Sequence, residues 1–152
     1  HQPYENLVYY GRGPFENYID RYSSSFIGRY EDKVENQFYW YIRPQETGNK
    51  TDVRWLSLLD SEGQGVRITG LQPISFSALH FSPEDLDPGL TRKLQHTIDI
   101  VPQKNIFLHV DLKQRGLGGD NSWGMYPHNE YRLLDKKYTY SYMIELVEKN
   151  SD

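Results

Sequence analysis

The chain has 152 residues, with 17 basic and 21 acidic side chains and a formal net charge of −4. This length predicts one domain that can bury roughly 70% of the surface of its unfolded chain without disulfide or metal cross-links. The acidic balance argues against a nucleic-acid binder, since such proteins carry a basic stripe. The absence of cysteine excludes disulfides, thiolate metal ligands and a cysteine nucleophile.

No apolar stretch reaches the roughly 20 residues that a membrane-spanning helix needs. The first residue is His1 rather than methionine, and we expect that the original N-terminus was removed together with any targeting signal. A chain without cysteine fits the cytoplasm and the periplasm equally well. The sequence therefore leaves the compartment open.

Strands are predicted along most of the chain, because apolar and polar positions alternate with a period of two. The alternation is clearest in Asn36–Arg43, Asn105–Lys113 and Tyr138–Val147. A turn over Asp60–Gly63 separates two further runs, Val53–Leu59 and Gly65–Thr69. The 13 Tyr, 6 Phe and 3 Trp residues also fit strands. Aromatic rings stack on sugars as well, but the sheet is the simpler explanation.

One short helix is expected within Ser82–Asp87. Ser82 can cap it, Pro83 suits the first helical position, and Glu84 and Asp85 favour the positive helix end. No long apolar pattern of period 3.6 is present. The sequence thus predicts a single all-β domain built as an antiparallel β-sandwich.

The segment Tyr10–Arg21 combines turn-forming residues with the charged side chains Arg12, Glu16, Asp20 and Arg21. Such a cluster can be a polar ligand site. We favour the other interpretation, in which paired charges pin an irregular loop whose backbone groups need partners.

The segment Arg115–Gly124 has three glycines in four positions, followed by Trp123 between Ser122 and Gly124. Glycine disfavours a strand here but lets the backbone approach another surface closely. The loop either displays the indole ring to a neighbouring surface or uses it to plug the end of the sandwich. The pattern alone leaves both interpretations open. A phosphate loop is excluded, because its lysine and Ser/Thr are missing.

No catalytic machinery is predicted. His109 and Asp111 are two residues apart on one strand face, which suggests a hydrogen-bonded pair rather than a metal site. Retaining sugar hydrolysis needs two carboxyl groups about 5–5.5 Å apart. Glu46, Glu84 and Glu145 lie in a turn, at a helix start and on a strand, and none has a setting that indicates an activated acid or nucleophile.

Five motifs resemble, in the same order, the C-terminal domain of glycoside hydrolase family 2 β-galactosidases. They are Gly13–Arg21, Tyr41–Asn49, Val53–Trp55, Phe76–Ala78 and Gly118–Trp123. The chain departs from the family pattern at Ile19, where proline is usual, and at Thr47, where asparagine is usual. We interpret the latter position as structural.

The resemblance implies a domain of an enzyme that cleaves terminal β-D-galactosides such as lactose, with catalytic glutamates in a barrel that residues 1–152 lack. These residues would be the C-terminal portion of an antiparallel sandwich, itself part of a galactose-mutarotase-like supersandwich and the core of the small subunit in two-chain members. The implied partner is the rest of the enzyme chain, and the parent enzyme would be an oligomer. No nucleic acid or membrane is implied as a partner. The fragment itself would hold no cofactor or metal, whereas parents commonly use magnesium and sodium ions.

By the same resemblance, the glycine-rich loop reaches the mouth of the active site. Trp123 would stack on the aglycone, the group that leaves galactose, with Asp120, Asn121 and Ser122 beside it in a substrate-binding segment. No residue is assigned a catalytic role. Two other classes remain: a free-standing carbohydrate-binding module, which should present several coplanar rings on an open face, and a purely structural interaction domain, in which Trp123 has no ligand.

Overall fold

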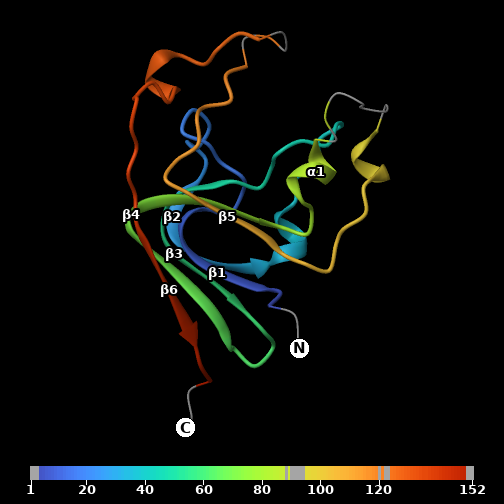
Figure 1. The fold of residues 1–152 in the computed structure, drawn as a ribbon, viewed down its shortest axis with the longest axis vertical. Helices are drawn as coiled ribbons and strands as arrows, with labels where there is room; N and C mark the ends of the chain where they lie inside the picture. The colour runs from blue at the N-terminus through green and yellow to red at the C-terminus, as the bar shows by residue number, and fades with distance from the viewer. Residues whose placement is uncertain (1–3, 88, 90–94, 120, 122–123, 150–152) are drawn as a thin grey trace.

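The computed structural model describes residues 4–87, 89, 95–119, 121 and 124–149. Within these residues the regular structure consists of antiparallel strands and a few short helical turns, which irregular segments such as 38–49 and 132–141 connect (Figure 1). The strands are β1 (Asn6–Gly13), β2 (Phe26–Lys33), β3 (Lys50–Leu59), β4 (Gly65–Leu79), β5 (Phe107–Asp111) and β6 (Tyr142–Val147). The helical turns are η1 (Val34–Gln37), α1 (Pro83–Leu86), η3 (Thr97–Asp99) and η4 (Asn129–Tyr131).

The strands form one sheet in the order β2-β1-β3-β4-β5, and β6 also pairs with β4. β4 has 15 residues and three partners. It pairs with β3 along one edge, and along the other edge Gly65–Gly70 pairs with β6 and Ser75–Leu79 pairs with β5. Register shifts in the β3–β4 ladder lie around Val53, and β4 turns sharply along its length in Figure 1. Because β4 bends, the sheet curls over its own inner face. The predicted all-β, antiparallel, sandwich-like fold is confirmed.

The main core lies on the inner face of this curved sheet. Cross-strand neighbours such as Leu7 and Leu58, or Tyr9 and Leu56, put apolar side chains next to each other. The buried cluster consists of Leu7, Tyr9, Val34, Val53, Leu56, Leu58, Ile68, Ile74, Phe76 and Ala78. From the β5 side, Leu108 and Val110 pack against it. A second, smaller cluster lies under α1 and contains Phe38, Leu79, Phe81, Leu86 and Ile100.

Most of the predicted elements are present. β5 lies within Asn105–Lys113, β6 covers the last part of Tyr138–Val147, and the β3–β4 turn is closed by the Asp60 carboxylate, which accepts hydrogen bonds from Glu62 N and Gln64 N. The Ser82 hydroxyl accepts from Asp85 N at 3.2 Å and caps α1 as expected. No helix among the described residues has the length and apolar character needed to cross a membrane.

The strand predicted over Asn36–Arg43 is wrong. Its beginning belongs to η1, and the rest has no regular secondary structure. Phe38 is buried in the smaller cluster, with its ring centroid 4.4 Å from that of Phe81. Backbone N–H groups that a ladder would use make local bonds instead, from Tyr39 to the Thr47 hydroxyl and from Tyr41 to the Tyr39 carbonyl. Local bonding and aromatic packing therefore replaced strand pairing.

Candidate functional site

The first two motifs of the sequence meet at Glu16, whose side chain is only 1% exposed. Its Oε2 atom accepts hydrogen bonds from the Thr47 hydroxyl and the Gly48 N–H, both at 2.7 Å. Its Oε1 atom contacts the Arg21 guanidinium and the Tyr41 hydroxyl. Burial raises the pKa of Tyr41, and the hydrogen bond to Glu16 raises it further, so the phenol remains a donor. We call these five residues the Glu16 cluster.

Asn17 makes a second junction between the same motifs. It is completely buried, and its Oδ1 atom accepts from Thr51 N at 2.9 Å and from the Thr51 hydroxyl at 2.5 Å. The Asn17 N–H donates to the Asn49 carbonyl at 2.8 Å, and the Asn49 amide donates back to the Asn17 carbonyl at the same distance. These bonds tie the loop after β1 to the start of β3.

The charges of Tyr10–Arg21 thus pin an irregular loop, as predicted. Arg12 pairs with Asp52 and Arg21 with Glu16, while the Arg12 guanidinium also donates to the Ser25 carbonyl at 2.9 Å.

Thr47 has the structural role expected from the sequence, because its buried hydroxyl supplies one of the donors to Glu16. Four donors occupy Glu16, which leaves it poorly suited to be a proton donor or a nucleophile.

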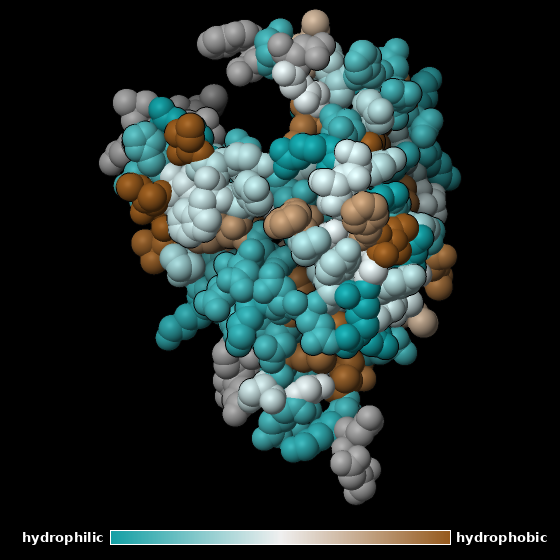
Figure 2. Space-filling model, turned by 180° about the vertical axis from the view of Figure 1, so that it is seen from behind, coloured by the Kyte–Doolittle hydropathy of each residue, from teal (hydrophilic) through white to brown (hydrophobic). Residues whose placement is uncertain are grey.

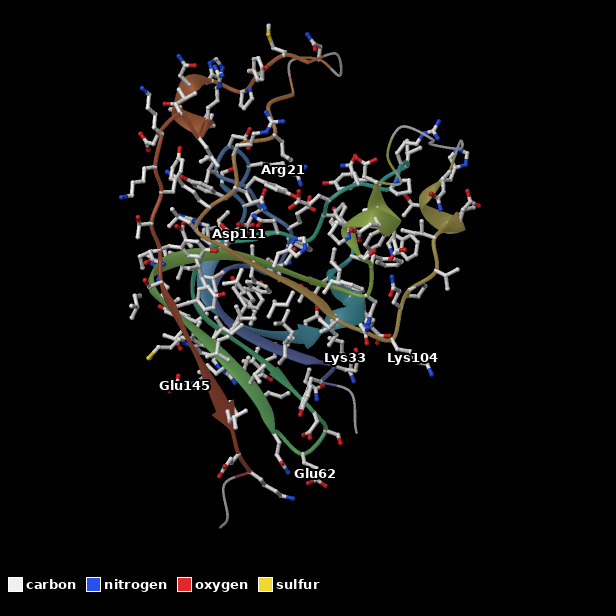
Figure 3. All side chains as sticks on the ribbon, viewed as in Figure 1. Arg21, Lys33, Glu62, Lys104, Asp111 and Glu145 are labelled. Carbon is white, nitrogen blue, oxygen red and sulfur yellow. The ribbon has the colours of Figure 1, made fainter. Side chains whose placement is uncertain are left out.

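The glycine-rich segment joins this assembly through Asp20. Asp20 Oδ2 accepts a 2.8 Å hydrogen bond from Gly118 N, and Gly116 N donates to the Tyr131 carbonyl at 2.7 Å. A Cβ atom on Gly116 would lie 2.6 Å from Asp20 Oδ2 and 2.8 Å from Tyr131 Cβ. Only glycine fits such an approach. In Figure 3, the labelled Arg21 marks this end of the molecule, away from Glu62 at the β3–β4 turn.

Of the four predicted substrate-binding residues, Asp120, Ser122 and Trp123 lie outside the described residues. Asn121 is described and exposed, and its Oδ1 atom accepts from Met125 N at 3.4 Å. The role of the loop in binding an aglycone therefore stays a prediction.

A small cavity of about 180 Å³ adjoins Asp20 and Gly118. Its other lining residues are Tyr126, Pro127, His128 and Tyr131. Asp20 Oδ1 is buried, and within the part of the chain that the structure describes it has no hydrogen-bond partner. Sequence reasoning missed this cavity, because residues 126–131 carry no motif and meet Asp20 only through the fold.

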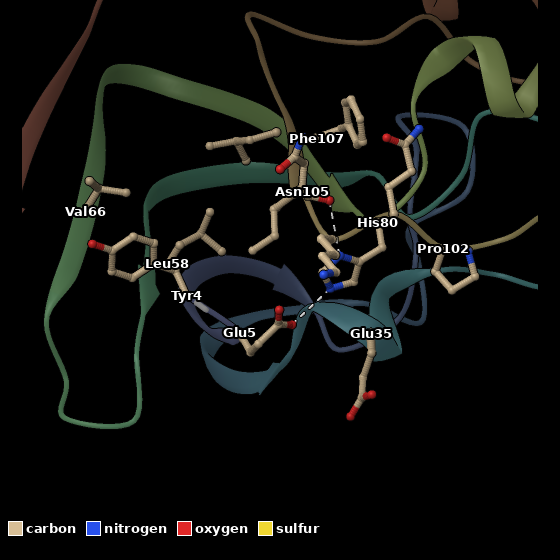
Figure 4. Close-up of a pocket in the computed structure, with 13 residues that line it drawn as sticks. Tyr4, Glu5, Glu35, Leu58, Val66, His80, Pro102, Asn105 and Phe107 are labelled. Carbon is tan, nitrogen blue, oxygen red and sulfur yellow. Dashed lines mark hydrogen bonds and ion pairs between the residues drawn. The ribbon is translucent and has the colours of Figure 1, made fainter. Parts of the chain in front are cut away.

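Another cavity is an open groove of about 1160 Å³ on a different part of the molecule (Figure 4). Leu58, Val66 and Leu108 contribute apolar walls. At its edge the two ring nitrogens of His80 contact Glu5 Oε2 at 3.0 Å and the Asn105 carbonyl at 3.2 Å. Sequence reasoning gave His80 no role, since its two partners are far away along the chain.

Nothing in the described part of the chain gathers three His, Asp or Glu side chains that could hold a metal ion. The use of magnesium and sodium ions by the parent enzyme stays a prediction. The hydrogen bond found at the Asp111 carboxylate comes from the Gln114 amide at 3.0 Å, and none was found between Asp111 and His109, the predicted pair.

Residues 1–144 match the protein family described as "Beta galactosidase small chain". The chain belongs to this β-galactosidase family. It is 36% identical over 143 residues to "Beta-galactosidase" of Priestia megaterium and 35% identical over 144 residues to that of Streptococcus thermophilus, which in both cases is 93% of the chain. A further β-galactosidase, from Halalkalibacterium halodurans, is 35% identical over 131 residues, or 86% of the chain.

The aligned part of this family member covers only 12–14% of the length of those three relatives. The relatives thus contain a large additional portion of polypeptide. Activity, substrate and partners of a whole enzyme are accordingly matters of proposal for this chain.

Proposed function

We propose that this chain is a non-catalytic C-terminal domain of a family 2 β-galactosidase, an enzyme that hydrolyses terminal β-D-galactosides such as lactose. In this proposal the rest of the enzyme supplies the catalytic glutamates and holds galactose. The domain contributes the loop with Trp123 to the active-site mouth, where the indole contacts the aglycone. Membership of the β-galactosidase small-chain family carries this proposal.

The packing of the motifs supports the proposal. Two of the matched motifs serve as a scaffold. The Glu16 cluster locks the loop after β1 to the segment before β3, and Asn17 locks it to the start of β3. Asp20, at the end of the same loop, contacts the beginning of the glycine-rich segment. A rigid scaffold that supports a loop is the usual way for a domain to present a binding residue.

The proposal also requires that the isolated chain be inactive. Glu16 is the one buried acidic residue among those described, and four donors occupy its carboxylate. We expect no hydrolysis of a chromogenic galactoside by the purified chain. Turnover that rises in proportion to the chain and disappears when one of its own carboxylates is changed would contradict this.

The deciding experiment is Trp123→Ala in the whole enzyme, with Trp40→Ala as the matched control. Trp40 is exposed and lies outside the glycine-rich loop. We expect Trp123→Ala to weaken binding of glucose-like acceptors and to slow transfer to them, while the denaturation midpoint of the domain changes little.

If Trp123 is instead a buried core residue, the expected loss of stability in Trp123→Ala can be stated. A tryptophan that plugs a core costs roughly 3–5 kcal/mol of stability when truncated to alanine. A large fall in the denaturation midpoint with unchanged acceptor affinity would show that Trp123 is a core residue and would overturn its assignment to the aglycone.

A further inference from the structure

We propose that Asp20 is a positioning residue for acceptor binding: its carboxylate fixes the segment Gly116–Gly118, and through it the loop that carries Trp123. This inference rests on the proposed function of Trp123. The Glu16 cluster and Asn17 already hold the loop after β1 in place. Asp20 is therefore not needed to hold that loop, and we assign it a different role.

The backbone around Asp20 is held in place on both sides. Tyr18 and Arg21 exchange two backbone hydrogen bonds, of 3.1 Å and 2.8 Å, which close a tight turn around Asp20. Arg21 is in turn paired with the buried Glu16. Asp20 therefore lies in a turn that is anchored to the scaffold, so the backbone that carries its carboxylate is held in one position.

The glycine-rich segment is shaped to receive that carboxylate. Gly118 N donates to Asp20 Oδ2 across 98 positions of sequence, and Gly116 N donates to the Tyr131 carbonyl. The close approach at Gly116 leaves no room for a side chain between Asp20 and Tyr131. The segment is thus clamped between these two residues at two neighbouring points, and hydrogen bonds to a charged acceptor are the strong kind.

The second carboxylate oxygen shows that stability alone does not explain Asp20. Oδ1 is buried, and none of the described residues gives it a hydrogen bond, which is costly for a polar atom. The other oxygen of this carboxylate binds Gly118, in the segment Gly116–Gly118, which we call the stem of the loop. Positioning of the stem explains why a carboxylate is kept here at this cost.

The consequence for binding follows from distance along the chain. Trp123 is five residues after Gly118, so the stem sets where the loop leaves the scaffold. A misplacement of about 1 Å can cost up to about 100-fold in rate. Loss of the clamp should therefore weaken binding at the aglycone position, where an acceptor also binds, and leave the chemical step on galactose nearly unchanged.

The clamp itself is tested in the isolated chain by amide hydrogen exchange at Gly118. Asp20→Ala should abolish its protection, whereas Asp20→Asn should keep it, because the amide oxygen can still accept. Asp135→Ala, at an exposed aspartate further along the chain, is the matched control and should change nothing. Unchanged protection of Gly118 in Asp20→Ala overturns the proposal.

The effect on binding is tested in the whole enzyme with glucose as the acceptor. We expect Asp20→Ala to raise the KM for glucose by about tenfold or more, to leave kcat for hydrolysis of a chromogenic donor within about twofold, and to be rescued by Asp20→Asn. Gly116→Ala should reproduce the defect from the other side of the contact. Gly28→Ala is its control, since a Cβ there meets only ordinary contacts at 3.4 Å.

The outcomes separate this inference from the proposed function. An unchanged KM for glucose in Asp20→Ala and Gly116→Ala, with a raised KM in Trp123→Ala, overturns the role of Asp20 in acceptor binding. An unchanged KM in all three overturns the proposed function, and with it the acceptor role of Asp20. If Asp20→Ala does not fold, Gly116→Ala decides both measurements.

Discussion

The hydroxyl of Thr47 donates a 2.7 Å hydrogen bond to Oε2 of Glu16, and both side chains are buried. Thr47→Val removes this donor and keeps the shape of the side chain. Glu16 then loses a partner that water cannot replace. We expect a loss of about 1–3 kcal/mol in the free energy of unfolding, measured by urea denaturation.

The control for this change is Glu31→Gln, which breaks an ion pair with Arg29 in which both side chains are 59% exposed. Exposed pairs of this kind contribute little, so no measurable change is expected. Equal stability of Thr47→Val and the unchanged chain would show that the Glu16 cluster does not hold the two loops together.

Sequence reasoning predicted the fold class and the short helix because both depend on local patterns. Alternating residues marked β5 and β6, and Ser82 with Asp85 formed the expected cap. It failed for Asn36–Arg43, since alternation cannot tell a paired strand from a loop whose Phe38 is buried by Phe81.

For the candidate site as well, the sequence predicted what depends on local patterns and missed what depends on tertiary contacts. The motifs named the residues that matter, Glu16, Asn17, Asp20 and Thr47, but not how they meet. Asp20 and Gly118 are 98 residues apart, and no period or spacing encodes that contact. The cavity beside Asp20 is likewise a product of tertiary structure.

Lys50 gives the domain a specific dependence on pH. The residue is 2% exposed, and its ammonium group donates to the Gly48 carbonyl at 3.3 Å. Burial lowers the pKa of Lys50 from 10.5 to about 8, although Glu16 and Asp32 act in the opposite direction. Below pH 8 the folded chain must hold a buried charge, which costs stability relative to a neutral side chain.

The sign follows from proton binding. Between pH 8 and 10.5 the unfolded chain binds more protons at Lys50 than the folded chain, so this group makes stability rise with pH. The difference in unfolding free energy between the unchanged chain and Lys50→Met should rise by up to about 3 kcal/mol across this window. Tyr9 and Tyr18, whose pKa values burial raises, are present in both proteins and cancel.

Urea denaturation at several pH values between 7 and 10.5 measures this difference. Lys104→Met serves as the control, because Lys104 is exposed on the rim of the large groove. A difference that is the same at every pH would contradict the buried, destabilising charge at Lys50.

The inner face of the sheet is buried at some positions and exposed at others. Truncation of an apolar side chain on this face should therefore reduce the free energy of unfolding by different amounts at different positions. Leu56 lies opposite Ile68, which lies opposite Ile144 on β6, so these positions share a face. Leu56 is 1% exposed, whereas Leu146, on the same face of β6, is 80% exposed. Leu56→Ala should cost about 2–5 kcal/mol, and Leu146→Ala less than about 0.5 kcal/mol. Thermal or urea unfolding of the two variants checks this, and equal losses would mean that β6 is covered in solution.

The apolar side of β6 also predicts self-association of the isolated chain. Ile144 is 65% exposed and Leu146 80%, and they continue the face that Leu58 and Ile68 bury further inside. Elsewhere on the surface, the side of the molecule seen in Figure 2 has hydrophobic residues scattered among hydrophilic ones. Within the described residues β6 pairs with β4 alone, so its outer edge is free as well.

Two ways of associating are possible, and one pair of variants separates them. If copies meet through the apolar face, Ile144→Lys places a charge in the contact and should reduce association, whereas Met143→Lys, on the opposite face of β6, should not. If copies meet through the free strand edge, a lysine on either face should weaken pairing to a similar degree. We expect the first result, because the exposed face is continuous with the core and the apolar area removed from water is larger there. Sedimentation velocity over a range of concentrations measures it, and an unchanged chain that stays monomeric at its highest concentration would contradict the prediction.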